Sequence, residues 1–138
     1  MSSTRPGAAE DLAEIAAIQA ACPEAAQWPP EDYLSFDFQV SIRGPRIAGF
    51  AVSRIIGPGE RELLNLAVAP DFRRQGIGAE LVRSLQTEPS VCVFLEVRES
   101  NQGARAFYKS LGFQEVGIRS GYYPTSPESA IVMKFHSC

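Results

Sequence analysis

Residues 65–78 read Asn-Leu-Ala-Val-Ala-Pro-Asp-Phe-Arg-Arg-Gln-Gly-Ile-Gly, and this segment is the most informative about the fold class. Residues 63–69 form an apolar run that Pro70 ends, which predicts a strand. A basic loop with two glycines follows. The next segment predicts a helix over 77–85, because its apolar side chains recur at helical spacing, at Ile77, Leu81, Val82 and Leu85. The order strand, glycine loop, helix is typical of sites that bind an anion.

The loop favours phosphate for a physical reason. The first turn of a helix leaves backbone N–H groups unpaired and carries about half a positive charge. Glycines let a ligand approach that backbone closely, and Arg73 and Arg74 add positive charge. The spacing alone also fits a glycine turn that opens an ordinary surface helix. The P-loop pattern is absent, and the Rossmann fingerprint lacks its third glycine.

The residues before this stretch predict a helix and an antiparallel meander. Residues 8–22 have helical spacing up to Pro23, and a short helix is expected over 31–34. Residues 36–42 alternate apolar and polar side chains, as a half-buried strand does. A further strand is predicted over 47–56.

The residues after the helix predict a second sheet segment. Residues 91–95 form a continuous apolar run, which predicts a central strand buried on both faces. Asn101 is a plausible N-cap and Gly112 a plausible C′ residue of the next helix. The last strands are expected over 113–118 and 130–135. We therefore predict an α/β (α+β) fold with a mixed central sheet and about four helices, in a single domain over 1–138.

Composition limits the function. The chain has 138 residues, 13 basic and 16 acidic side chains, and a formal charge of −3, which disfavours non-specific binding to nucleic acid or membranes. Cys22, Cys92, Cys138 and His136 lack metal-ligand spacing, so no metal site is expected. The chain start lacks the apolar core of a signal peptide, and we expect a cytoplasmic protein.

Several motifs together resemble the GNAT superfamily of acyl-CoA-dependent N-acetyltransferases. Arg73, Gly76 and Gly78 match its R/Q-x-x-G-x-G/A motif. Residues 95–101 and 106–113 match too, and within the superfamily they look most like ribosomal-protein alanine N-acetyltransferases. The segment 118–124 is similar to that subfamily's tyrosine pair before proline. The resemblance covers residues 62–135 well, whereas 1–61 match mainly in element order.

The resemblance implies a GNAT fold and acetyl-CoA as cosubstrate. It implies cofactor contacts from backbone groups of Leu66, Ala67 and Val68, where the family's strand bulges and splays from its neighbour. It also implies contacts along the loop and at the next helix, from Arg73, Arg74, Gln75, Gly76, Ile77, Gly78, Ala79 and Asn101. Asn101 could serve as helix cap and cofactor contact at once.

Two residues are expected to carry the chemistry. Glu96 follows the apolar run, and burial in such a place suits a carboxylate to act as a general base. The alternative is an ordinary charged residue at a solvated strand end. In the resembling subfamily the matching glutamate takes the amine proton through water. Tyr108 lies on an apolar helix face and could be a core residue, but the resemblance makes its hydroxyl the general acid for the departing thiolate.

The expected acceptor is the N-terminal α-amine of a protein, an alanine of a ribosomal protein by resemblance. An α-amine has a pKa of about 7.7–8.0 against about 10.4 for lysine, so more of it is neutral at pH 7. Tyr122 and Tyr123 are expected to wall the peptide site, although they could merely pack on their loop. Ser129 stands where relatives often have Asp, which weakens the peptide assignment. A small-amine or lysine acetyltransferase and a non-catalytic acyl-CoA-binding module remain alternatives.

Overall fold

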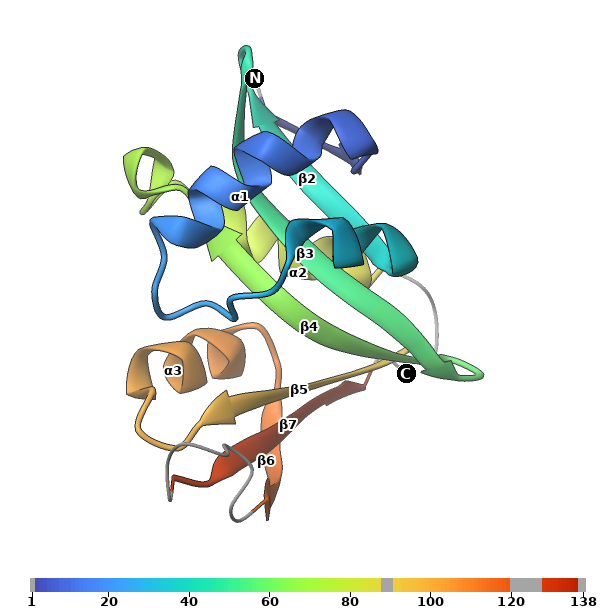
Figure 1. The fold of residues 1–138 in the computed structure, drawn as a ribbon. Helices are drawn as coiled ribbons and strands as arrows, with labels where there is room; N and C mark the ends of the chain where they lie inside the picture. Colours follow the sequence, from blue (N-terminus) through green and yellow to red (C-terminus); the bar gives the residue numbers. More distant parts are fainter. Residues whose placement is uncertain (1, 88–90, 120–127, 137–138) are drawn as a thin grey trace. The chain divides into compact units, whose positions relative to one another are not determined.

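The computed structural model describes residues 2–87, 91–119 and 128–136 (Figure 1). They form seven strands, three α-helices and three 3-10 turns (labelled η), which lie in this order along the chain: β1 Ser2–Pro6, η1 Ala9–Asp11, α1 Leu12–Ala20, η2 Pro30–Ser35, β2 Asp37–Arg43, β3 Arg46–Gly57, β4 Glu60–Val68, η3 Pro70–Phe72, α2 Ile77–Leu85, β5 Cys92–Arg98, α3 Gln102–Ser110, β6 Gln114–Arg119 and β7 Ala130–His136.

The strands make one mixed sheet in the order β1-β2-β3-β4-β5-β7-β6. β4 and β5 are parallel, with Glu60 to Glu62 of β4 opposite Cys92 to Phe94 of β5. β1 and β2, β2 and β3, β5 and β7, and β6 and β7 are antiparallel. The mixed sheet and the predicted meander over β2 to β4 are thereby confirmed.

The described residues fall into two compact units. Unit 1 comprises Met1–Arg54 and Leu63–Leu85, and unit 2 comprises Ile55–Glu62 and Gln86–Cys138. The residues of β4 that pair with β5 belong to unit 2. That residues 1–138 make one domain stays a prediction.

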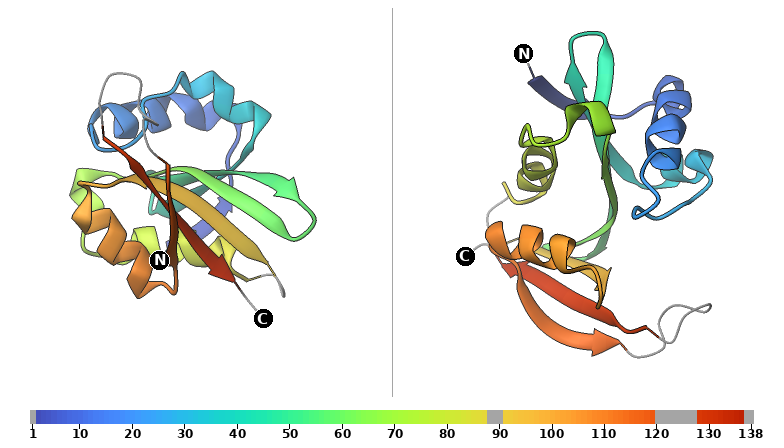
Figure 2. Two further views of the ribbon diagram at one scale, coloured as in Figure 1. Left: turned by 90° about the horizontal axis from the view of Figure 1, so that it is seen from below. Right: turned by 90° about the vertical axis from the view of Figure 1, so that its left-hand side faces the viewer.

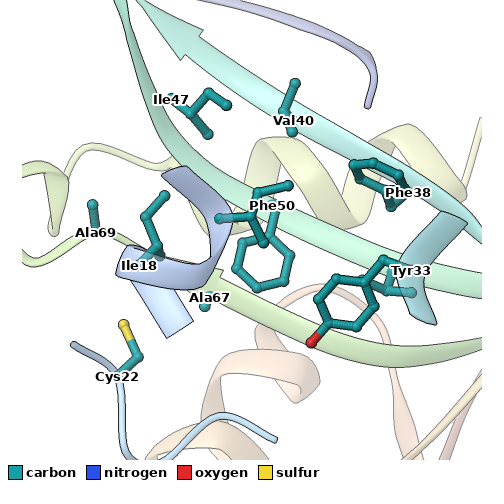
Figure 3. Close-up of a cluster of buried hydrophobic side chains, with 11 residues drawn as sticks. Ile18, Cys22, Tyr33, Phe38, Val40, Ile47, Phe50, Ala67 and Ala69 are labelled. Carbon is teal, nitrogen blue, oxygen red and sulfur yellow. The ribbon is translucent and has the colours of Figure 1, made fainter. Parts of the chain in front are cut away.

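In unit 1 the sheet has helices on both faces. α1 and η2 lie on one face and α2 on the other (Figure 2). Under α1 and η2, apolar side chains from the helices and from β2, β3 and β4 form a buried core (Figure 3). On the other face α2 approaches β3 so closely that a Cβ at Gly49 would lie 3.2 Å from the Ile77 side chain and 2.8 Å from the Ala67 carbonyl oxygen. Gly49 is therefore required by the close approach of neighbouring backbone.

In unit 2 one face of β5 and β7 is covered by α3. Burial alternates along β5, and Val93, Leu95 and Val97 form the covered side. The Tyr108 ring of α3 contacts the Phe113 ring edge-on at 5.5 Å, and Phe113 in turn contacts Phe135 of β7 at 5.7 Å. This aromatic chain fixes the helix on its strands.

Two sequence predictions need correction, and one strand was not predicted. β1 was missed because Ser2–Pro6 has no alternation of apolar and polar residues and joins the sheet edge through backbone pairing with β2. The helix over 8–22 is shorter and begins with a 3-10 turn, where Asp11 accepts hydrogen bonds from the Ala8 N–H and from Arg5. The strand over 91–95 extends to Arg98 and is not buried on both faces, since the residues that alternate with its buried ones keep partial exposure.

Candidate functional site

The backbone changes course at two points in the loop between β4 and α2. Arg74 has a φ of 65° and Gly76 has a φ of 77°, both in the left-handed region. Arginine rarely adopts this conformation, which costs about 1–2 kcal/mol per residue. A strained loop conformation of this kind is a feature of ligand-binding sites. Gly76 meets the need for a positive φ without strain.

The loop leads directly into the first turn of α2. The Glu80 N–H donates to the Gly76 carbonyl at 3.0 Å, so Gly76 accepts the first hydrogen bond of the helix. The N–H groups of Ile77, Gly78 and Ala79 belong to that turn and point back along the helix axis. Apart from Gly76 and its two chain neighbours, no described residue has a heavy atom within 4 Å of the position that a Cβ at Gly76 would take. That these residues bind a diphosphate stays a prediction.

The Arg73 guanidinium is engaged with the segment after α1. Its Nη2 lies 3.0 Å from Glu24 Oε1 and 3.6 Å from Cys22 Sγ. The sequence predicted that the positive charge of Arg73 lies beside the bound phosphate. The structure pairs that charge with a carboxylate, while Arg74 and Gln75 are exposed.

Leu66, Ala67 and Val68 form the end of β4. Ala67 points into the core, and the side chains of Leu66 and Val68 are half-buried. The Cys22 thiol contacts the Val68 carbonyl oxygen at 3.3 Å. The ladder with β5 pairs residues 60–62 of β4, and Leu66 to Val68 lie further along the strand, beginning four residues after Glu62.

A buried polar network, which sequence reasoning missed, precedes these residues. Asn65 exchanges two hydrogen bonds with the Ala26 backbone, at 3.2 and 3.0 Å, and donates to the Tyr33 hydroxyl at 2.9 Å. The Tyr33 hydroxyl donates to Gln19 Oε1, and Gln19 Nε2 donates to the Trp28 carbonyl at 2.7 Å. This network holds residues 26–28 on β4. The only sequence signal was a polar residue within an apolar strand.

Glu96 lies within β5 of unit 2, opposite Val132 of β7. Its side chain is 17% exposed. Oε1 accepts a hydrogen bond from Arg119 Nη1 at 2.9 Å. Oε2 is buried and has no hydrogen-bond partner in the part of the chain that the structure describes. Glu96 therefore does not lie at a solvated strand end, and its role as the general base stays a prediction.

Tyr108 also belongs to unit 2 and is 8% exposed. Its ring makes edge contacts with Phe107 and Phe113, at 5.0 and 5.5 Å. Burial raises the pKa of the Tyr108 hydroxyl well above its ordinary value of 10.0. The phenol therefore keeps its proton at neutral pH, as a general acid must.

Asn101 caps α3 as the sequence predicted. Its side-chain oxygen accepts a hydrogen bond from the Ala104 N–H at 3.0 Å. The predicted cofactor contact of Asn101 stays a prediction. Tyr122 and Tyr123, predicted to wall the acceptor site, lie outside the described residues.

Among residues 2–87, 91–119 and 128–136, no group of three or more His, Cys, Asp or Glu side chains could hold a metal ion. In the same ranges no helix is both long enough and apolar enough to cross a membrane.

The family model for the acetyltransferase (GNAT) family matches residues 10–113. This chain belongs to the GNAT acetyltransferase family. The match includes the β4–α2 loop, Glu96 and Tyr108, and it confirms the family that the motifs at 73–78 and 95–113 resembled.

Characterised GNAT proteins resemble the chain over much of its length. A [ribosomal protein bS18]-alanine N-acetyltransferase of Escherichia coli K12 is 42% identical over 109 residues, which are 75% of this chain and 71% of that protein. Its Salmonella typhimurium counterpart is 46% identical over 94 residues, 64% of this chain and 63% of the relative. An N-alpha-acetyltransferase RimI of Mycobacterium tuberculosis is 39% identical over 78% of this chain and 74% of its own.

Solved GNAT structures share the whole fold. The ribosomal-protein-S18-alanine N-acetyltransferase of Escherichia coli superposes with a TM-score of 0.83 at 30% identity, covering 100% of this chain and 96% of that one. Naa20 of Chaetomium thermophilum, in complex with a bisubstrate analogue, gives 0.83 at 26% identity, over 98% of this chain and 86% of that one. The GNAT fold expected from the sequence is thereby confirmed.

Proposed function

We propose that this chain transfers the acetyl group of acetyl-CoA to the N-terminal α-amine of a protein, and that the acceptor begins with alanine and is a ribosomal protein. Its relatives in Escherichia coli and Salmonella typhimurium are named as [ribosomal protein bS18]-alanine N-acetyltransferases, which supports this acceptor. We place the reaction in the cytoplasm, where such an acceptor is made.

The loop and first turn of α2 supply cofactor binding in this proposal. The amides of residues 76–79 bind the diphosphate, helped by Arg74 and Gln75 and by the dipole of α2. Backbone groups of Leu66 to Val68 bind the pantetheine arm and polarise the thioester carbonyl. Asn101 contacts the cofactor beside its role as helix cap.

Glu96 and Tyr108 handle the two protons of the reaction. The acceptor nitrogen forms a bond to the carbonyl carbon, and the bond from that carbon to sulfur breaks. Glu96 accepts the proton lost by the amine, through a water molecule, and Tyr108 donates a proton to the departing sulfur. The observation that carries the proposal is the Glu96 carboxylate, mostly buried in β5 with Oε2 ready to accept a hydrogen bond.

The test is thiol release from acetyl-CoA with two hexapeptides, one with a free N-terminal alanine and one N-blocked with an internal lysine. We expect faster turnover of the alanine peptide, because its amine is neutral more often at pH 7. Glu96→Gln should slow that turnover by about 10²-fold or more at pH 7, and less above pH 8, where the amine has lost its proton unaided. The reverse ranking of the peptides would refute the acceptor. A Glu96→Gln variant with the normal rate would show that Glu96 is not the general base.

A further inference from the structure

The pairing register places Arg119 close to Glu96 although two strands separate them. β7 lies between β5 and β6. Glu96 is opposite Val132, and Val132 is opposite Gly117. Arg119 lies one row further along β6, opposite Ala130. Side chains two residues apart on a strand share a face, so Arg119 emerges on the face that carries Glu96.

Small residues let the Arg119 side chain cross β7. Gly117 has no side chain, and Ala130 has only a methyl group. An irregularity in the β6–β7 register between Glu115 and Gly117 sets which residues of β6 face this way. The long arginine side chain thus passes over β7 and places Nη1 2.9 Å from Glu96 Oε1.

The other cations on this face have partners of their own. The Lys134 ammonium lies 5.6 Å from the centre of the Phe94 ring. Arg98 lies 3.4 Å from Glu128, whose other oxygen accepts from the Ser100 N–H at 2.6 Å. Arg119 is therefore the cation that the structure assigns to Glu96.

Arg119 forms a hydrogen bond to one carboxylate oxygen of Glu96, Oε1, and not to the other, Oε2. With Oε1 held, Oε2 is the buried oxygen without a hydrogen-bond partner in the described ranges. The last torsion of a glutamate is broad, so an unrestrained carboxylate would exchange its oxygens and tilt. A hydrogen bond to an arginine restricts that motion.

We propose that Arg119 is a positioning residue that holds Glu96 so that Oε2 receives the proton of the acceptor amine. This inference rests on the proposed function, since it needs Glu96 as the base. It assigns a role to a residue of the 118–124 segment to which the family resemblance gave none.

The first experiment compares Arg119→Gln and Arg119→Lys with wild type, using the alanine peptide and acetyl-CoA at pH 7. We expect kcat to fall about 10-fold or more in Arg119→Gln, because a misplaced catalytic group loses a large factor in rate. KM for acetyl-CoA should not change. Arg119→Lys should recover part of the rate, since its ammonium can still bond to Oε1. The matched control is Arg98→Gln, an arginine on the same face that pairs with Glu128 instead, and its kcat should stay normal.

The second experiment places Arg119→Gln in the Glu96→Gln background. A residue that acts through Glu96 has no further effect once the carboxylate is gone, so the double variant should match Glu96→Gln alone. An equal loss of kcat in both backgrounds, or a normal kcat in Arg119→Gln, overturns the inference. If Glu96→Gln itself keeps the wild-type rate, Glu96 is not the base, and the positioning role of Arg119 is refuted as well. A slow Glu96→Gln beside a normal Arg119→Gln removes Arg119 alone.

Discussion

At the scale of single residues, the buried Tyr108 hydroxyl gives a direct test of the proton donor. Burial raises its pKa, so the phenol stays protonated through neutral and mildly alkaline pH. We expect Tyr108→Phe to lower kcat by about 10²-fold, the usual contribution of a general acid, with acetyl-CoA affinity unchanged. Wild-type kcat should not decline between pH 8 and pH 10 through loss of this proton. Steady-state kinetics over that range and calorimetric titration of acetyl-CoA measure both quantities.

The matched control for that variant is Tyr33→Phe, which removes a phenol oxygen buried in unit 1. Its kcat should change little, although the hydrogen bonds to Gln19 and Asn65 are affected. Equal losses of kcat in the two variants would make Tyr108 a structural tyrosine.

The sequence motifs offer Glu96 and Tyr108 as candidates, whereas they do not indicate the contact of Arg119 with Glu96. Glu96 and Tyr108 stand in contiguous motifs whose spacing is fixed by one strand and one helix. The Arg119–Glu96 contact depends on two ladders and on the irregularity near Glu115, and register over such distances is not encoded in a local pattern. The ion pair of Arg73 with Glu24 was missed for the same reason, because the two residues are distant in sequence.

At the scale of elements, a substitution at Gly76, the glycine with positive φ before α2, distinguishes a loss of acetyl-CoA binding from a loss of fold stability. Gly76→Ala forces a side chain onto a φ of 77° and should destabilise the fold by about 1–2 kcal/mol. The loop would relax by moving its amides, so KM for acetyl-CoA should rise as well. Gly44→Ala is the matched control, since Gly44 has a φ of 58° in the β2–β3 turn and equally open surroundings. Gly44→Ala should lose similar stability in urea unfolding while its KM for acetyl-CoA stays normal. A normal KM in Gly76→Ala would contradict the diphosphate assignment.

Most elements could be predicted because their apolar period was clear, as in β2 and α2. The exceptions are instructive. β1 has no apolar period at all, and its place comes from backbone pairing with β2. The apolar Cys92 and Phe94 predict that β5 is buried on both faces, yet both side chains are partly exposed on the face that carries Glu96. An apolar run therefore identified the strand but not which of its faces is covered.

At the scale of the whole molecule, each unit buries a tyrosine whose ionisation opposes folding. Burial raises the pKa of Tyr33 in unit 1 and of Tyr108 in unit 2 above 10.0. A raised pKa means that the folded chain holds the phenolic proton more tightly than the unfolded chain does. The stabilisation is therefore complete below about pH 10 and is lost as pH rises through the folded-state value. The free energy of unfolding should fall above pH 10, each tyrosine contributing at most about 1.4 kcal/mol per pH unit.

Urea unfolding at pH 8 to 11 measures this slope. Tyr33→Phe and Tyr108→Phe should each flatten it, whatever they do to stability at pH 8, because phenylalanine has no proton to lose. An unchanged slope in both variants would show that lysine deprotonation, not the tyrosines, governs alkaline unfolding.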